Sequence, residues 1–155
     1  QNIGDKYRNV IGIFMNQIMQ DKPMTIFGDG SQTRAFSYID DVAPYIARCV
    51  DMPAAYNRVF NIGADTPYSV GCLAETVAKA FGVEPNIRYL TARNEVVNAY
   101  SDHTLAREVF GITDMIELEE GITRMAAWAR QVGARASKEF EGIEITRNLP
   151  AGWQK

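Results

Sequence analysis

The residues best suited to binding a ligand stand in the stretch IFGDGSQTRAFSYIDD, residues 26–41. Arg34 follows a glycine-rich turn there, and its guanidinium is permanently charged and can pair with two phosphate oxygens at once. Phe27 precedes the same turn and offers an aromatic face on which a nucleotide base can stack. The pattern is typical of a site for an anion attached to a planar group, where each charge-assisted hydrogen bond contributes about 1.5–3 kcal/mol.

A simpler interpretation of this stretch is a turn that binds nothing. Gly28 and Gly30 would supply backbone angles that other residues rarely adopt. Arg34 would then pair with Asp29 at the surface. The Gly-Asp-Gly triplet is not followed by Gly-Lys-Ser/Thr, so it is not a P-loop. Asp40 and its acidic neighbour have the residue types of paired catalytic acids, but Asp40 is more typical of a helix N-cap.

Short strands and helices are expected to alternate along the chain, which favours an α/β fold in one unit. The hydrophobic pattern predicts strands at 24–27, 34–39, 58–63 and 86–90, and helices at 11–21, 40–49, 69–81, 102–111 and 114–132. Ser69 is expected to cap its helix and Gly82 to end it. Asp114 and Glu117 are expected to form a capping box for the last helix. Residues 139–155 show no clear period.

Composition excludes several classes of function for these 155 residues. The net charge is -3, with basic and acidic residues interspersed, so a nucleic-acid partner is not expected. No apolar run approaches the ~18 residues of a membrane span. One histidine and no Cys-x-x-Cys argue against a metal site. Cys49 and Cys72 fall within predicted helices and are expected as buried, reduced thiols, which points to the cytoplasm.

Residues 24–43, MTIFGDGSQTRAFSYIDDVA, resemble a stretch of the extended short-chain dehydrogenase/reductases that modify nucleotide sugars. These are the UDP-glucose 4-epimerases and their dehydratase and decarboxylase relatives. The resemblance continues through VFNIG, the SV that begins a helix, AYSDHTLAREVFG and GITRMAAW, at 59–63, 69–70, 99–111 and 121–128. It implies that residues 1–155 are the small C-terminal substrate-binding domain of such an enzyme, without its N-terminal Rossmann half.

The resemblance also implies which side chains bind the nucleotide of the substrate. They are Asn9, Val10, Thr25, Phe27, Arg34, Arg93 and Glu95. The first two begin the helix that lines the pocket, Thr25 and Phe27 contact the uracil, the arginines bind the diphosphate, and the glutamate meets the ribose hydroxyls. The family's Arg-x-Gly-Asp appears here as Arg93-Asn94-Glu95, one residue shorter and with a different acid.

The catalytic residues of the family have no counterparts in this sequence. There is no Gly-x-x-G-x-x-Gly for NAD, and none of the seven tyrosines has a lysine four residues later. The resemblance implies that the whole enzyme binds NAD through the absent half and transfers hydride to and from the sugar. This chain is therefore expected to bind no cofactor and to be inactive alone.

The chain begins at Gln1, without an initiator methionine, and is interpreted as a fragment of a longer protein. The resemblance implies that VFNIG, at 59–63, joins the edge of the sheet in the absent half. In isolation the chain should therefore expose apolar surface and an unpaired strand edge, and it should self-associate. The alternatives are a UDP-sugar dehydratase or decarboxylase fragment, and a stand-alone nucleotide-binding or interaction module without catalysis.

Overall fold

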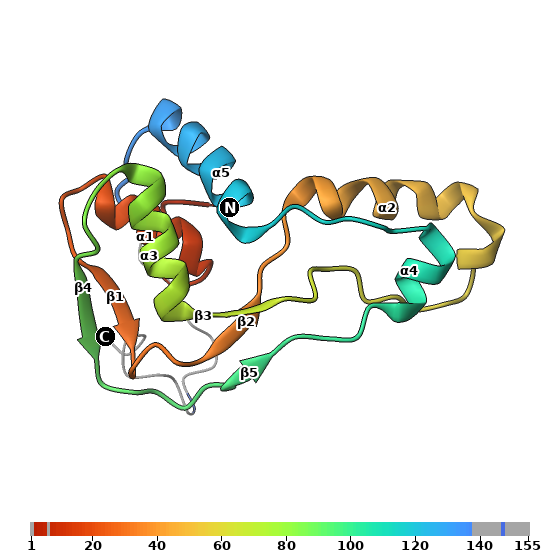
Figure 1. The fold of residues 1–155 in the computed structure, drawn as a ribbon, viewed down its shortest axis with the longest axis horizontal. Coiled ribbons are helices and arrows are strands. Elements are labelled where there is room, and N and C mark those ends of the chain that lie inside the picture. The colour runs from red at the N-terminus through yellow and green to blue at the C-terminus, as the bar shows by residue number, and fades with distance from the viewer. Residues whose placement is uncertain (1, 6, 138–146, 148–155) are drawn as a thin grey trace.

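The computed structural model describes residues 2–5, 7–137 and 147, which form a larger body and a narrower arm (Figure 1). We define the arm as residues 39–62 and 102–115, which extend to the right in Figure 1. The other described residues make the body. The expected alternation of short strands with helices is confirmed, and the fold is mixed α/β.

The core of the body lies between three helices and a pair of strands. The helices are α1 (Val10–Ile18), α3 (Val70–Phe81) and α5 (Leu118–Val132), and the strands are β1 (Met24–Phe27) and β4 (Ile87–Leu90). In β1, Met24 and Ile26 point into this core, whereas Thr25 and Phe27 are only half-buried on the opposite face. The period of two in a strand therefore reserves one face of β1 for packing and leaves the other face for the site.

Helix α3 begins and ends where its residue types predict. The Ser69 hydroxyl oxygen accepts a hydrogen bond from the Cys72 amide, 3.0 Å away, and Gly82 ends the helix with a left-handed φ of 69°. Leu73 and Val77 are fully buried on its inner face. Both ends depend on neighbours in the sequence, which explains why sequence signals locate them.

The strands form two small sheets. Strand β1 pairs with β4 in parallel, and Phe27 lies opposite Leu90 at their carboxyl ends. The second sheet places β2 (Thr33–Ala35) between β3 (Pro67–Ser69), which is antiparallel to it, and β5 (Asn98–Ala99), which is parallel. The chain leaves β1 for β2 and leaves β4 for β5, so two connections run side by side from one sheet to the other.

The arm has a small core of its own. The arm contains helices α2 (Ala43–Arg48) and α4 (Thr104–Phe110) and the 3₁₀ turns η1 (Ile39–Asp41), η2 (Cys49–Asp51) and η3 (Pro53–Ala55). Phe110 of α4 and Ala55 of η3 belong to one buried cluster, against which Tyr45 of α2 packs. The Phe110 ring lies 4.9 Å from that of Phe60 and 5.9 Å from that of Tyr45, centre to centre. Hydrophobic side chains nevertheless remain exposed on the arm, at Ile46, Val50, Tyr56 and Val59.

Two predicted strands differ from the structure. Residues 58–63 form no strand, because no described strand pairs with them. The strand predicted at 34–39 ends at Ala35, which lies opposite Pro67, a residue without an N–H to continue the ladder. In both segments the residue types suit a strand, but no strand among the described residues pairs with residues 36–39 or 58–63.

Two predicted helix caps are also wrong. Asp40 lies within η1 and caps no helix, and its neighbour Asp41 accepts a hydrogen bond from the Ile116 amide at 2.8 Å. Glu117 stands at the N-cap of α5 without a side-chain cap, because its carboxylate accepts a hydrogen bond from the Tyr68 hydroxyl. Both carboxylates are thus used in tertiary contacts.

Both cysteines are free, but Cys72 is exposed and not buried as expected, while Cys49 is half-buried. No helix in the described part of the chain combines the length and the apolar character needed to cross a bilayer. The segment 139–155, whose sequence has no clear period, lies outside the described residues apart from Arg147.

Candidate functional site

The candidate site begins where β1 and β4 end together. The Gly28 amide donates to the Leu90 carbonyl at 3.0 Å, so the two strands still pair as the turn begins. Gly28 has a φ of 75°, and a Cβ there would lie 3.7 Å from the Ala92 Cβ. The parallel register therefore brings the glycine turn after β1 against the loop after β4, although about sixty residues separate them in the sequence.

The loop from β4 to β5 carries two of the predicted residues, Arg93 and Glu95. The Arg93 guanidinium carbon lies 4.3 Å from the centre of the Phe27 ring, a cation–π contact. Farther along the loop, the Val97 carbonyl accepts a hydrogen bond from the Thr33 amide at 2.8 Å. The loop is therefore attached to both sheets, and Glu95 lies in the stretch between those attachments.

Arg34 points its guanidinium toward this loop. One terminal nitrogen donates to the Thr33 carbonyl at 2.7 Å and to the Val97 carbonyl at 3.2 Å. The other lies 3.4 Å from Oε2 of Glu95. About a quarter of each of these two charged side chains is exposed, so solvent weakens the ion pair.

Arg34 does not pair with Asp29, as the simpler turn interpretation required. The Asp29 carboxylate accepts hydrogen bonds from the Ser31 hydroxyl at 2.7 Å and the Ser31 amide at 2.9 Å. These two bonds lower the pKa of Asp29. Asp29 closes the turn locally, which leaves Arg34 to interact with the distant loop.

Glu95 contacts three charged or polar side chains. Its Oε2 lies 3.4 Å from Arg34 and 3.5 Å from Arg93, and its Oε1 lies 3.4 Å from the Gln32 amide nitrogen. Gln32 also donates to the Phe27 carbonyl at 3.0 Å. Gln32 belongs to the Gln-x-Arg motif and directly precedes β2, but the sequence predicted no role for it.

The other predicted residues lie on or beside α1. Thr25 exchanges two hydrogen bonds with Gln17 of α1, at 2.9 and 3.1 Å, which joins the outer face of β1 to that helix. Asn9 precedes α1 with a φ of 67°, and Val10 begins the helix and packs against the core. No hydrogen bond or ion pair among the described residues connects Asn9 or Val10 to the arginines. The structure thus brings Phe27, Arg34, Arg93 and Glu95 together.

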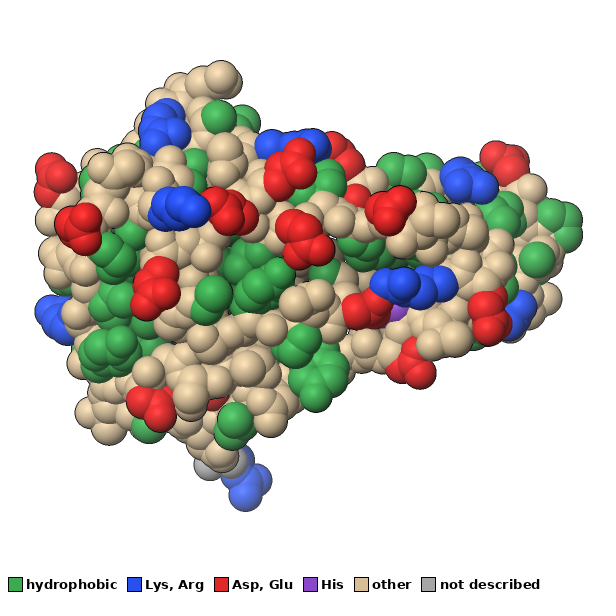
Figure 2. Space-filling model, viewed as in Figure 1, with side chains coloured by type: hydrophobic (Ala, Val, Ile, Leu, Met, Phe, Trp, Pro, Cys, Tyr) green, Lys and Arg blue, Asp and Glu red, His purple; other side chains and the backbone are tan. Residues whose placement is uncertain are grey.

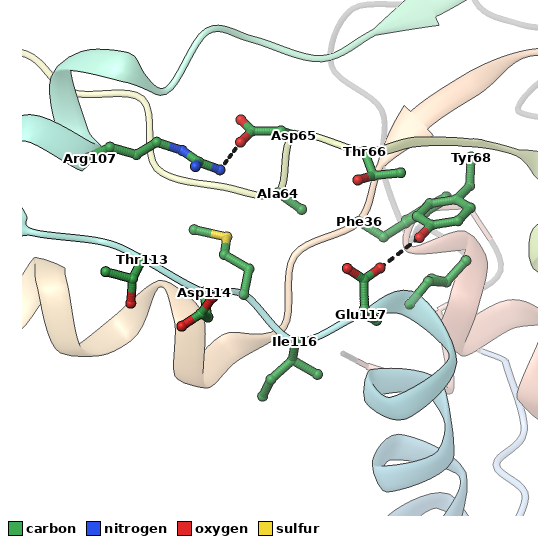
Figure 3. A pocket seen from close by; sticks show the side chains of 12 residues that line it. Phe36, Ala64, Asp65, Thr66, Tyr68, Arg107, Thr113, Asp114, Ile116 and Glu117 are labelled. Carbon is green, nitrogen blue, oxygen red and sulfur yellow. Dashed lines mark hydrogen bonds and ion pairs between the residues drawn. The ribbon is translucent and has the colours of Figure 1, made fainter.

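A small polar cavity of about 230 Å³ lies elsewhere, between the body and the arm (Figure 3). The Tyr68 hydroxyl donates to Glu117 at 3.0 Å on one side of it, and Arg107 pairs with Asp65 on the other. Burial and the hydrogen bond to Glu117 raise the pKa of Tyr68. None of the predicted binding residues lines this cavity.

Sequence reasoning missed a buried polar cluster around His103, which is only 5% exposed. Its Nδ1 lies 2.6 Å from the Asp65 carboxylate and its Nε2 lies 2.9 Å from the Ser101 hydroxyl. Arg107 pairs with the other oxygen of Asp65. A Cβ at Gly63 would lie 3.0 Å from the Ser37 hydroxyl and 3.2 Å from His103 Nε2, so glycine lets the segment before Asp65 pack closely against this cluster.

The contacts from Ser101 to His103 and from His103 to Asp65 have the residue types of a catalytic triad. A catalytic nucleophile, however, needs a cavity for its substrate. Neither Ser101 nor His103 lines the cavity of Figure 3. The cluster instead joins the start of α4 to the segment that follows residue 62, and we interpret it as structural. The described residues include no group of three or more side chains that could bind a metal ion.

A second and larger cavity, of about 580 Å³, runs along α5 and is mainly apolar. It is lined by side chains of α5 and of the segment from Phe36 to Val42, and includes the partly exposed Trp128. Gly121 allows the Tyr38 ring to approach α5, because a Cβ there would lie 3.3 Å from that ring. Nothing in the described part of the chain shows what covers this groove.

Comparison with known proteins extends these observations. Residues 2–63 match the model of a family described as the NAD dependent epimerase/dehydratase family. UDP-glucuronate 4-epimerase of Thermodesulfobacterium geofontis is 29% identical over 119 residues, which are 76% of this chain and 36% of that protein. A putative UDP-glucose 4-epimerase of Methanocaldococcus jannaschii is 34% identical over 122 residues, which are 78% of this chain and 39% of that protein.

The fold matches as well. The crystal structure of UDP-glucuronic acid 4-epimerase from Bacillus cereus, in complex with UDP-glucuronic acid and NAD, has a TM-score of 0.74 and 26% identity to this chain. The match covers 83% of this chain and 42% of that one. The chain thus spans about two fifths of the length of the relatives it matches. The chain is related to the NAD dependent epimerase/dehydratase family, which it matches in sequence over residues 2–63, and it matches the fold of UDP-glucuronic acid 4-epimerase over 83% of its length.

Proposed function

We propose that this chain is the C-terminal substrate-binding half of an NAD-dependent sugar-nucleotide epimerase, and that it holds the UDP of the substrate. The convergence of Phe27, Arg34 and Arg93 around the loop that follows β4 is the observation that carries the proposal. Two guanidinium groups beside an aromatic ring suit a diphosphate joined to a planar base. In this assignment residues 1–155 are one domain.

Every predicted residue except Glu95 has a role in this proposal. Arg34 and Arg93 bind the diphosphate, and the uracil lies against Phe27 and near Thr25, on the outer face of β1. Asn9 and Val10 contribute the start of α1 beside the nucleotide. This handle does not react, but the free energy of binding it positions the sugar carbon that does.

The glycine turn of the candidate site does not have the form that binds NAD. A dinucleotide pyrophosphate is bound where a glycine-rich turn leads into a helix N-terminus. Here the turn at Gly28 and Gly30 leads into strand β2 instead. We therefore assign the cofactor and the catalytic groups to the N-terminal half of the whole protein, and expect no turnover from this chain alone.

The surface of the arm supports the same proposal. Val59, in the segment predicted as a strand, is 88% exposed, and Val50 is 72% exposed. Figure 2 shows hydrophobic side chains at the far end of the arm. Exposing these side chains to water costs free energy, and a domain that covered them would remove that cost.

A titration with UDP, followed by saturation transfer to the uracil protons, tests the proposal. We expect Arg34→Ala to weaken UDP binding by about 2 kcal/mol, roughly 30-fold, because one charge-assisted contact to phosphate is lost. Arg48→Ala, which removes an exposed arginine of the arm, is the matched control and should bind UDP as the unmodified chain does. Equal affinities in the two variants would mean that Arg34 is only a turn residue.

A further inference from the structure

One carboxylate oxygen of Glu95 lies between two guanidinium groups. Oε2 is 3.4 Å from Arg34 and 3.5 Å from Arg93, while Oε1 is 3.4 Å from the Gln32 amide nitrogen. Strong charge-assisted hydrogen bonds are nearer 2.7–2.9 Å. All three contacts of Glu95 are therefore long, and one carboxylate is shared between two guanidinium groups.

The aromatic partner in the same site is also covered. Arg93 lies over the Phe27 ring, with 4.3 Å between the guanidinium carbon and the ring centre. The side chains of the chain itself thus fill the positions that we assign to the diphosphate and the base. A nucleotide that enters the site must replace these contacts.

We propose that Glu95 is an internal counter-anion, which competes with the diphosphate of the ligand for Arg34 and Arg93. The inference rests on the proposed function and deepens it. A diphosphate carries more negative charge than one carboxylate and offers separate oxygens to each arginine, so it displaces Glu95. The affinity for the nucleotide is lowered by the interactions that Glu95 gives up.

Among anionic ligands, Glu95 therefore favours those that can contact both arginines, because other anions do not replace it. The resemblance to the family implies another role, in which this acid accepts hydrogen bonds from the ribose. The two roles predict opposite changes in nucleotide affinity when the charge of Glu95 is removed. If Glu95 binds the ribose, the nucleotide binds more weakly, whereas if Glu95 competes with the diphosphate, the nucleotide binds more tightly.

The test compares Glu95→Gln with the unmodified chain in calorimetric titrations with UDP, inorganic pyrophosphate and uridine. We expect UDP and pyrophosphate to bind about three- to tenfold more tightly to the variant, because it loses two partly exposed ion pairs that oppose binding. Uridine has no phosphate, and its affinity should stay unchanged. Thermal unfolding of both proteins verifies that the variant is folded.

Glu84→Gln is the matched control. It makes the same change of charge at an exposed position that precedes the start of β4, whereas the site lies after the end of that strand. It should leave all three affinities unchanged. Unchanged or weaker UDP binding by Glu95→Gln overturns the inference, as does an equal gain for uridine. If neither protein binds UDP, the proposed function fails and the inference fails with it.

Discussion

The body and the arm bury their hydrophobic side chains to different degrees. In the body, three helices close over a parallel strand pair, and the side chains at its centre have no exposed surface, namely Phe14, Met15, Leu73 and Val77. In the arm, the buried cluster is small, and Val50 and Val59 point into solvent.

The lengths of the helices explain this difference. Helices α3 and α5 have 12 and 15 residues, long enough to present a continuous apolar face to a neighbour. Helices α2 and α4 have six and seven, too short to be stable without packing. The candidate site is built on the self-contained part of the chain, whereas the arm has a free surface for the half that we propose is absent.

The largest loss of stability is expected when a buried phenylalanine is removed from the body. Phe14→Ala in the body should destabilise the whole chain by about 3–5 kcal/mol, because it leaves a cavity among helices that cannot collapse around it. Phe110→Ala should instead unfold the arm and leave α3 protected. Chemical denaturation measures the first effect, and amide hydrogen exchange the second. Equal loss of protection in α3 in both variants would show that body and arm unfold as one unit.

The buried His103 cluster gives the next largest effect. His103→Ala removes the partner of Asp65 and Ser101 and should cost about 1–3 kcal/mol. The loss should be local, so that amides of α4 exchange faster while those of α1 do not. Ser101→Ala removes only one of the two contacts and should have the smaller effect. No change in α4 exchange would mean that the cluster does not hold the arm.

The smallest effect on stability is expected at the exposed surface of the arm. Val59→Ser should change the stability by less than about 0.5 kcal/mol, because the side chain is already in water. We propose that the chain self-associates through this surface, so the variant should shift sedimentation toward the monomer. Val83→Ser, at an exposed valine of the body, is the control and should not. A monomeric unmodified chain would contradict the proposal.

Sequence reasoning succeeded where a structure depends on neighbouring residues. Strand β1 and helix α3 were predicted with their ends, because turn glycines and the Ser69 hydroxyl act within a few residues. It failed at residues 58–63, whose side chains suit a strand but whose backbone pairs with no strand among the described residues. Glu117 suited a cap by its position, yet its carboxylate accepts a hydrogen bond from Tyr68, a partner that only the fold supplies.

The sequence by itself determined which residues can bind a nucleotide: an arginine after a glycine turn, an aromatic ring before it, and a second arginine farther along. Only the tertiary structure decided that they meet, because the parallel pairing of β1 with β4 brings two distant loops to one edge. It also decided that Glu95, and not Asp29, lies beside Arg34. Residue types carry the charge and shape that binding needs, whereas backbone pairing between distant segments sets the distances over which those charges act.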